Sequence, residues 1–165
     1  MTGAIAIIGC GNANRRDDGV GPEVLRLLAL DQPAGAIVNV RLLDAGTDGM
    51  SVMFAAKGCR TLIIVDACRS GAESGSVFEV PGRELEQPPR ESFNLHDFRW
   101  DHALFAGRKI FREQFPEDVT VFLIEAEHLD FGIGLSQTVT CAAHKVAGRI
   151  RELIADRQMA GVSAS

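Results

Sequence analysis

The chain has 165 residues, of which 46% are hydrophobic, and its formal net charge is −5. This length suits one domain with a substantial core, and the negative charge excludes the basic surface that nucleic-acid-binding proteins present. No apolar run approaches the roughly 20 residues of a membrane-spanning helix, and no signal-peptide pattern begins the chain, so we expect a soluble, cytoplasmic protein.

The first half of the chain alternates predicted strands with predicted helices. Residues 4–8 form a continuous apolar run, typical of a strand buried on both faces, and Pro22 is placed like the first residue of a helix. Further strands are predicted over residues 36–46 and 60–68, with a helix between them that Thr47 could cap. This order of elements predicts right-handed crossovers and a largely parallel sheet.

The second half has a long irregular segment followed by more regular elements. Residues 71–95 are rich in Gly, Glu, Ser, Arg and Pro, which predicts a loop interrupted by an edge strand at residues 76–80. A helix is predicted over residues 100–115 and a buried strand over residues 118–127. Ser136 is expected to cap the last helix.

Together these elements predict the α/β class. We expect one domain over residues 1–165: a three-layer α/β/α sandwich with a twisted, mostly parallel sheet of about five strands and helices on both faces. The last residues, about eight in number, are expected to fray.

Acidic residues follow three of the predicted strands. Asp17 and Asp18 come after the first strand, Asp44 ends the second and Asp66 ends the third. Because the carboxyl ends of parallel strands meet at one edge of a sheet, where ligands bind, these carboxylates should gather there. They would repel a phosphate and attract a cation.

Each of these acids also has a purely structural interpretation. Asp66 closes an apolar run and could cap the next turn through local backbone hydrogen bonds. A carboxylate such as Asp18, placed just before a helix, is favoured by the helix dipole. Asp44 and Thr47 could form a turn and a helix cap. Spacing alone leaves both interpretations open.

The histidines are candidate cation ligands in addition to the carboxylates. The chain has four of them: His96, His102, His128 and His144. Loops often deliver ligands to a rigid scaffold, which favours His96 at the end of the irregular segment. His144 falls within the last predicted helix, and spacing does not choose His96 over His102 or His128.

The four cysteines form no CxxC pair, which argues against a zinc ribbon or a thioredoxin-type motif. Their apolar surroundings indicate reduced, buried thiols. Cys10 and Cys68 lie close to the aspartates, but a nucleophilic thiol needs a nearby base and a lowered pKa. We expect burial rather than catalysis for both.

Five short motifs resemble, in order and at compatible spacing, those of the hydrogenase maturation endopeptidases, which process the large subunit of nickel–iron hydrogenases. They are GCGNANRRDDGVGPEV, LLDAGTDGM, LIIVDAC, NLHDF and GIGLS. The resemblance covers nearly the whole chain. The departures are residues 71–93, which show little similarity, the polar and aromatic run DFRWDHAL after His96, and Gln137, where a proline is common.

The resemblance implies removal of a C-terminal extension from a hydrogenase large-subunit precursor after nickel insertion, with nickel arriving on the precursor. The implied catalytic and nickel-recognising residues are Asp18, Asp66 and His96. The implied substrate-binding residues are Asp44, Gly46 and Thr47. We expect a monomer with no nucleic-acid or membrane partner.

Alternatives remain open for the mechanism of hydrolysis and for the function of the protein. Nickel could polarise the scissile carbonyl or activate a water, and Asp17 could act as a general base. A non-proteolytic assembly factor that senses nickel on the hydrogenase subunit would need the same trio. A nucleotide-binding domain fits less well, because Asn14 replaces the last glycine of the GxGxxG spacing.

Overall fold

The computed structural model describes residues 3–30, 39–91, 94 and 97–163, and five strands within these ranges form one sheet. They are β1 (Ala4–Cys10), β2 (Val40–Gly46), β3 (Cys59–Cys68), β4 (Val77–Pro81) and β5 (Asp118–Glu125). The order across the sheet is β2-β1-β3-β5-β4. Every neighbouring pair is parallel except β4 with β5, so β4 is an antiparallel edge strand.

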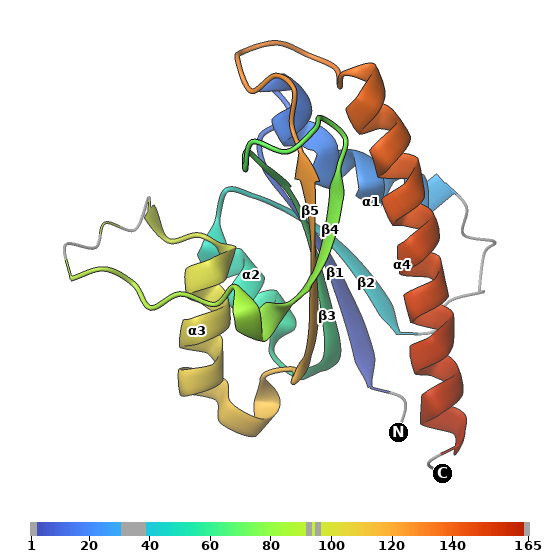
Figure 1. Cartoon of the computed structure of the whole chain (residues 1–165). Coiled ribbons are helices and arrows are strands. Elements are labelled where there is room, and N and C mark those ends of the chain that lie inside the picture. Colours follow the sequence, from blue (N-terminus) through green and yellow to red (C-terminus); the bar gives the residue numbers. More distant parts are fainter. Residues whose placement is uncertain (1–2, 31–38, 92–93, 95–96, 164–165) are drawn as a thin grey trace.

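Helices cover both faces of this sheet, as predicted (Figure 1). They are α1 (Val20–Leu30), α2 (Gly49–Ala56), α3 (Trp100–Phe111) and α4 (Gln137–Ser163). The helices α1 and α4 pack against one face, and α2 and α3 against the other. The three-layer α/β arrangement is therefore confirmed. In the described part of the chain, no helix has the length and apolar character needed to cross a membrane.

The central strands are apolar along their whole length because both of their faces are buried. On β1, Ile7 joins the core under α1 and α4, whereas its neighbour Ile8 joins the core under α2 and α3. Ile63 and Ile64 alternate in the same way on β3. This alternation explains why the apolar runs are continuous rather than spaced by two residues.

Two predicted details at β2 and α2 change. The strand β2 begins at Val40, whereas the prediction began at residue 36, and residues 36–38 lie outside the described ranges. Asp48, not Thr47, caps α2: its Oδ1 accepts the Met50 N–H at 2.9 Å. A carboxylate in that position also interacts favourably with the helix dipole.

The ends of β5 and α4 also differ from the prediction. The strand β5 ends at Glu125 rather than at residue 127. The helix α4 runs to Ser163, so most of the segment expected to fray is helical. Arg157 in that segment pairs with Asp118 at the start of β5, with Nε at 2.9 Å from Oδ2, which ties this part of the helix to the sheet.

The start of α1 touches the tips of β1 and β3 through Gly21. A Cβ placed on Gly21 would lie 2.7 Å from the Val65 carbonyl oxygen and closer still to that of Cys10. We expect Gly21→Ala to cost about 2 kcal/mol by overpacking, or about 6 °C in melting temperature. The control is Gly148→Ala in α4, where a Cβ meets nothing within 4 Å. That variant should melt at or above the wild-type temperature, because alanine favours helix; equal melting of both variants would contradict the close contact.

Candidate active site

A pocket of about 330 Å³ lies beyond the carboxyl ends of β1, β2 and β3. Its lining residues come from four parts of the chain: Cys10, Gly11, Asp18, Gly46, Thr47, Asp48, Gly49, Val52, Asp66, Arg99 and Trp100. Two of the predicted catalytic residues, Asp18 and Asp66, thus share one pocket with two of the predicted substrate-binding residues. The strand topology brings them together as expected.

Asp66 is the more buried acid of the pair, with 4% of its surface exposed. Its Oδ1 accepts the Ala67 N–H at 2.8 Å, and its Oδ2 accepts the Trp100 indole N–H at 2.8 Å and an Arg99 guanidinium N–H at 3.3 Å. Burial raises the pKa of Asp66, the Trp100 and Arg99 contacts oppose this, and the negative charge of Asp18 adds to it. Asp66 is therefore a desolvated carboxylate whose direction is fixed by its neighbours.

Asp18 lies in a single 3-10 turn, Arg16–Gly19, between β1 and α1. Its Oδ2 accepts the Asn12 N–H at 2.8 Å. The approach of the two segments requires Gly11, which has φ +116° and where a Cβ would collide with the Asp18 carbonyl oxygen. The glycine-rich motif therefore serves to place a carboxylate at the pocket, and not to cradle a phosphate.

The predicted third member of the trio, His96, lies outside the described residues. Among the other histidines, the His102 Nδ1 accepts the Arg99 backbone N–H at 3.3 Å at the start of α3. His128 and His144 are exposed, and neither lines the pocket of the acid pair. Within the described ranges, no three His, Cys, Asp or Glu side chains gather as a metal site. Three carboxylates line this pocket, and one of them, Asp48, is engaged in capping α2. Asp18 and Asp66 remain as the oxygen donors, and they suit a divalent cation that brings further ligands of its own.

The turn after β2 has both a structural role and residues that line the pocket. The Asp44 Oδ1 accepts the Gly46 N–H at 3.0 Å, so Asp44 stabilises the turn, and it does not line the pocket. Gly46 has φ +55°, and its carbonyl oxygen accepts the Gly11 N–H at 2.8 Å. Thr47 is exposed beside it. The segment is thus a turn whose Gly46 and Thr47 face the pocket.

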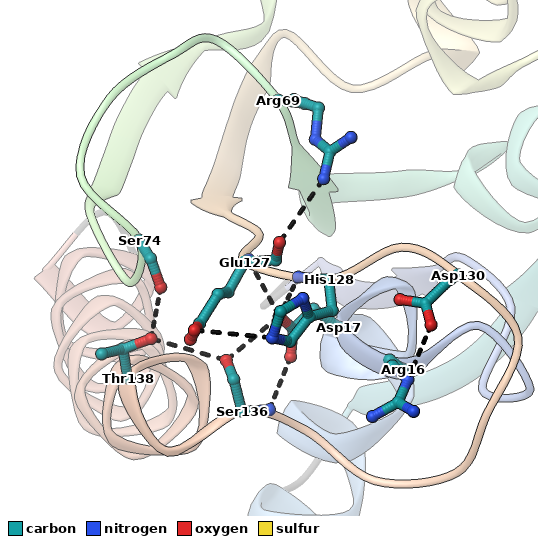
Figure 2. Close-up of polar contacts among 9 residues, drawn as sticks. All are labelled: Arg16, Asp17, Arg69, Ser74, Glu127, His128, Asp130, Ser136 and Thr138. Atoms are coloured by element: carbon teal, nitrogen blue, oxygen red, sulfur yellow. Dashed lines mark hydrogen bonds and ion pairs between the residues drawn. The ribbon is translucent and has the colours of Figure 1, made fainter.

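Asp17, although adjacent to Asp18, has a different role (Figure 2). It is 0% exposed, and its carboxylate accepts the N–H groups of Glu127, His128 and Ser136 at 2.7–2.9 Å and the Ser136 hydroxyl at 3.0 Å. Burial opposes these hydrogen bonds, but their net effect lowers the pKa of Asp17. The suggestion that Asp17 is a general base is wrong, because its oxygens are used to hold the loop before α4. Ser136 directly precedes α4, where the prediction placed it, and its hydroxyl donates to Asp17.

A sequence model of the hydrogenase maturation proteases matches residues 24–153, most of the chain. The chain belongs to the hydrogenase maturation protease family. The match includes Asp66 and begins after Asp18. The assignment of Asp18 to the site therefore depends on its sequence motif and on its position in the pocket.

Known proteins that are similar to this chain agree with the assignment. The hydrogenase 2 maturation protease of Escherichia coli K12 is 28% identical over 153 residues, which is 90% of this chain and 91% of that protein. The solved hydrogenase maturating endopeptidase HybD of E. coli has a TM-score of 0.68 and 25% identity, over 90% of this chain and 93% of that one. The coenzyme F420 hydrogenase subunit delta of Methanothermobacter thermautotrophicus is 33% identical over 100 residues, but the match spans only 59% of that protein and 56% of this chain.

The thiols near the acid pair of this family member are poor nucleophiles. Cys10 is 5% exposed, and burial raises its pKa, with Asp66 adding to the effect. Burial and a contact with Glu125 raise the pKa of Cys68 to about 12. Both thiols therefore stay protonated at neutral pH, which argues against a nucleophilic role. The expectation of buried thiols is confirmed for Cys10 and Cys59, but it is wrong for Cys68, which is only partly buried, and for Cys141, which is exposed.

The residues of the pocket that were not predicted include three with polar side chains: Asp48, Arg99 and Trp100. Arg99 and Trp100 belong to the polar and aromatic run that departs from the family pattern, and that unusual composition was the available signal. Glu125 was missed as well. It ends β5 and accepts the N–H groups of Ser70 and Gly71 and the Ser70 hydroxyl, and these bonds lower its pKa to about 2. Like Asp66, it is an acid at the end of an apolar strand.

Proposed function

We propose that this protein is an endopeptidase that removes a C-terminal extension from the large-subunit precursor of a nickel–iron hydrogenase after nickel insertion. The observation that carries the proposal is the shared pocket of Asp18 and Asp66 in a chain of this family. His96 is proposed as the third residue that recognises nickel on the precursor. The family membership and the E. coli relative, matched along 90% of this chain, support the reaction class.

The described side chains suggest how a cation on the substrate would be received. Trp100 holds the Asp66 carboxylate in one orientation, and Arg99 supplies a positive charge to it. Because the Arg99 side chain is 63% exposed, it can withdraw into solvent when a cation on the precursor takes its place. Nickel bound there would supply Lewis acidity to the scissile carbonyl or to a water. The protein contributes two oriented negative charges that precursor without the metal would not match.

The proposal is tested with purified precursor, prepared with and without nickel. We expect a time course on a gel to show a shortened subunit only with the nickel-loaded precursor, and mass spectrometry to identify the released C-terminal peptide. Binding of the nickel-loaded precursor without any shortening would overturn the peptidase assignment in favour of an assembly factor. Equal cleavage of both precursors would remove nickel recognition from the proposal.

A further inference from the structure

A second cavity, of about 490 Å³, borders the pocket of the acid pair. The two cavities share four lining residues: Asp18, Asp66, Arg99 and Trp100. The acid pair therefore lies at a junction, with space on both sides. A peptide spans about 3.3 Å per residue when extended, so a peptide bond held at the acids places its near neighbours in both cavities.

Three leucines from different elements line this second cavity: Leu85, Leu123 and Leu129. Leu123 lies on β5 directly opposite Asp66 on β3, and residues paired in this way point to the same face of a sheet. Leu85 follows the short 3-10 turn Gly82–Glu84, and Leu129 lies beyond the end of β5. We call these three residues the leucine subsite.

The three leucines of the subsite pack against the core on one side and are partly exposed to the cavity on the other. Leu85 and Leu123 pack against the core under α2 and α3, and Leu129 packs against the core under α1 and α4. All three are only partly buried, so each leaves apolar surface toward the cavity. Leu129 also belongs to the segment whose neighbours Glu127 and His128 are held by Asp17. These contacts fix the apolar wall before any ligand arrives.

The first pocket differs in chemistry from the second. Beyond the shared residues, the first pocket presents Cys10, Val52, Thr47, Asp48 and glycine backbone. The second presents the three leucines, and Ala67, Cys68, Arg69, Gln87 and Asp101 line the rest of it. We propose that the leucine subsite binds an aliphatic side chain of the precursor close to the bond that is cut. This inference rests on the proposed function and adds a specificity determinant to it. A charged side chain placed against the three leucines would lose its hydration there, so an aliphatic side chain is favoured at this part of the cavity.

The test uses nickel-loaded precursors in which the residues flanking the cut are replaced one at a time by aspartate. With the wild-type enzyme, aspartate at one aliphatic position should raise KM about 10-fold or more and leave kcat nearly unchanged. The variant Leu85→Lys should reduce that penalty, because its ammonium group pairs with the new carboxylate, and should raise KM for the natural precursor by about 10-fold. Ile110→Ser on α3, where the isoleucine is 62% exposed, is the matched control and should behave like wild type.

The possible failures are distinguishable. If the wild-type enzyme cuts no precursor, the proposed function fails, and the subsite proposal falls with it. If it cuts the natural precursor and tolerates aspartate at every flanking position, the leucine subsite alone is overturned. Should Leu85→Lys not fold, as judged by its melting curve, the aspartate series on the wild-type enzyme and the milder Leu85→Ala variant still decide the question.

Discussion

Asp66→Asn should lower the rate of precursor processing by at least about 100-fold, the loss expected when a charge that holds a catalytic cation is removed. The replacement keeps the shape of the side chain, removes its charge and turns one acceptor oxygen into an NH2 donor. The buried Asp66 carboxylate is the acid best shielded from water in the pocket, so its charge acts on a cation with little screening. The measurement is a single-turnover time course with nickel-loaded precursor.

The stability of the same variant separates catalysis from folding. The asparagine amide can accept only part of the hydrogen bonds that Asp66 now takes from Ala67, Trp100 and Arg99. Its neutrality removes the cost of burying a charge, and these two effects oppose each other. We expect the melting temperature to change by less than about 5 °C. Asp156→Asn, an exposed acid on α4, is the control for charge alone. Normal processing by Asp66→Asn would exclude this carboxylate from the reaction.

Asp17→Ala should have the largest effect on folding, lowering the free energy of unfolding by about 3 kcal/mol, or the melting temperature by about 10 °C. The change leaves three backbone N–H groups, those of Glu127, His128 and Ser136, without their acceptor. Asp130→Ala is the matched control in the same loop, because Asp130 is 68% exposed and pairs only with Arg16 among the contacts drawn in Figure 2. That variant should lie within about 0.5 kcal/mol of wild type.

The Asp17 effect has a defined pH dependence. Because the folded-state pKa of Asp17 is lowered, its contribution is fully present above the ordinary carboxyl pKa of 3.8 and is lost as the pH falls further. The stability gap between wild type and Asp17→Ala should therefore be constant near neutral pH and should narrow below that value. Denaturant titrations over this range measure the gap. A gap that widens on acidification, or none at neutral pH, would contradict the anchoring role.

The strands and the meeting of two acids could be predicted because they depend on local pattern and simple topology. Apolar runs located β1 and β3, and the rule that parallel strands end together placed Asp18 and Asp66 at one pocket. The same reasoning could not separate Asp17 from Asp18, which have the same side chain and adjacent positions. Only the folded loop around residues 127–136 decides which of the two turns inward.

Contacts between distant segments account for most of what the sequence did not reveal. Trp100 reaches Asp66 across 34 positions of the chain, and no local spacing links the two. Thr47 and Asp48 are both residue types that cap helices, so the sequence could not decide between them. In the structure α2 begins at Gly49, and Asp48 is the residue directly before it. The position of His96 remains a prediction, since it lies outside the described residues.

The hydrogen bonds between Asp17 and the loop before α4 have a consequence for how the protein folds during its synthesis. Its partners lie 110 to 119 residues further along the chain, so these bonds cannot form until the chain as far as Ser136 has left the ribosome. Contacts of such long sequence separation carry a loop-closure entropy cost, which slows folding. The glycine-rich turn that contains Asp17 is synthesised long before residues 127–136, whose N–H groups hold it in place. Asp18, the acid next to Asp17, therefore gains its final surroundings only after residues 127–136 have been made and have folded against the turn.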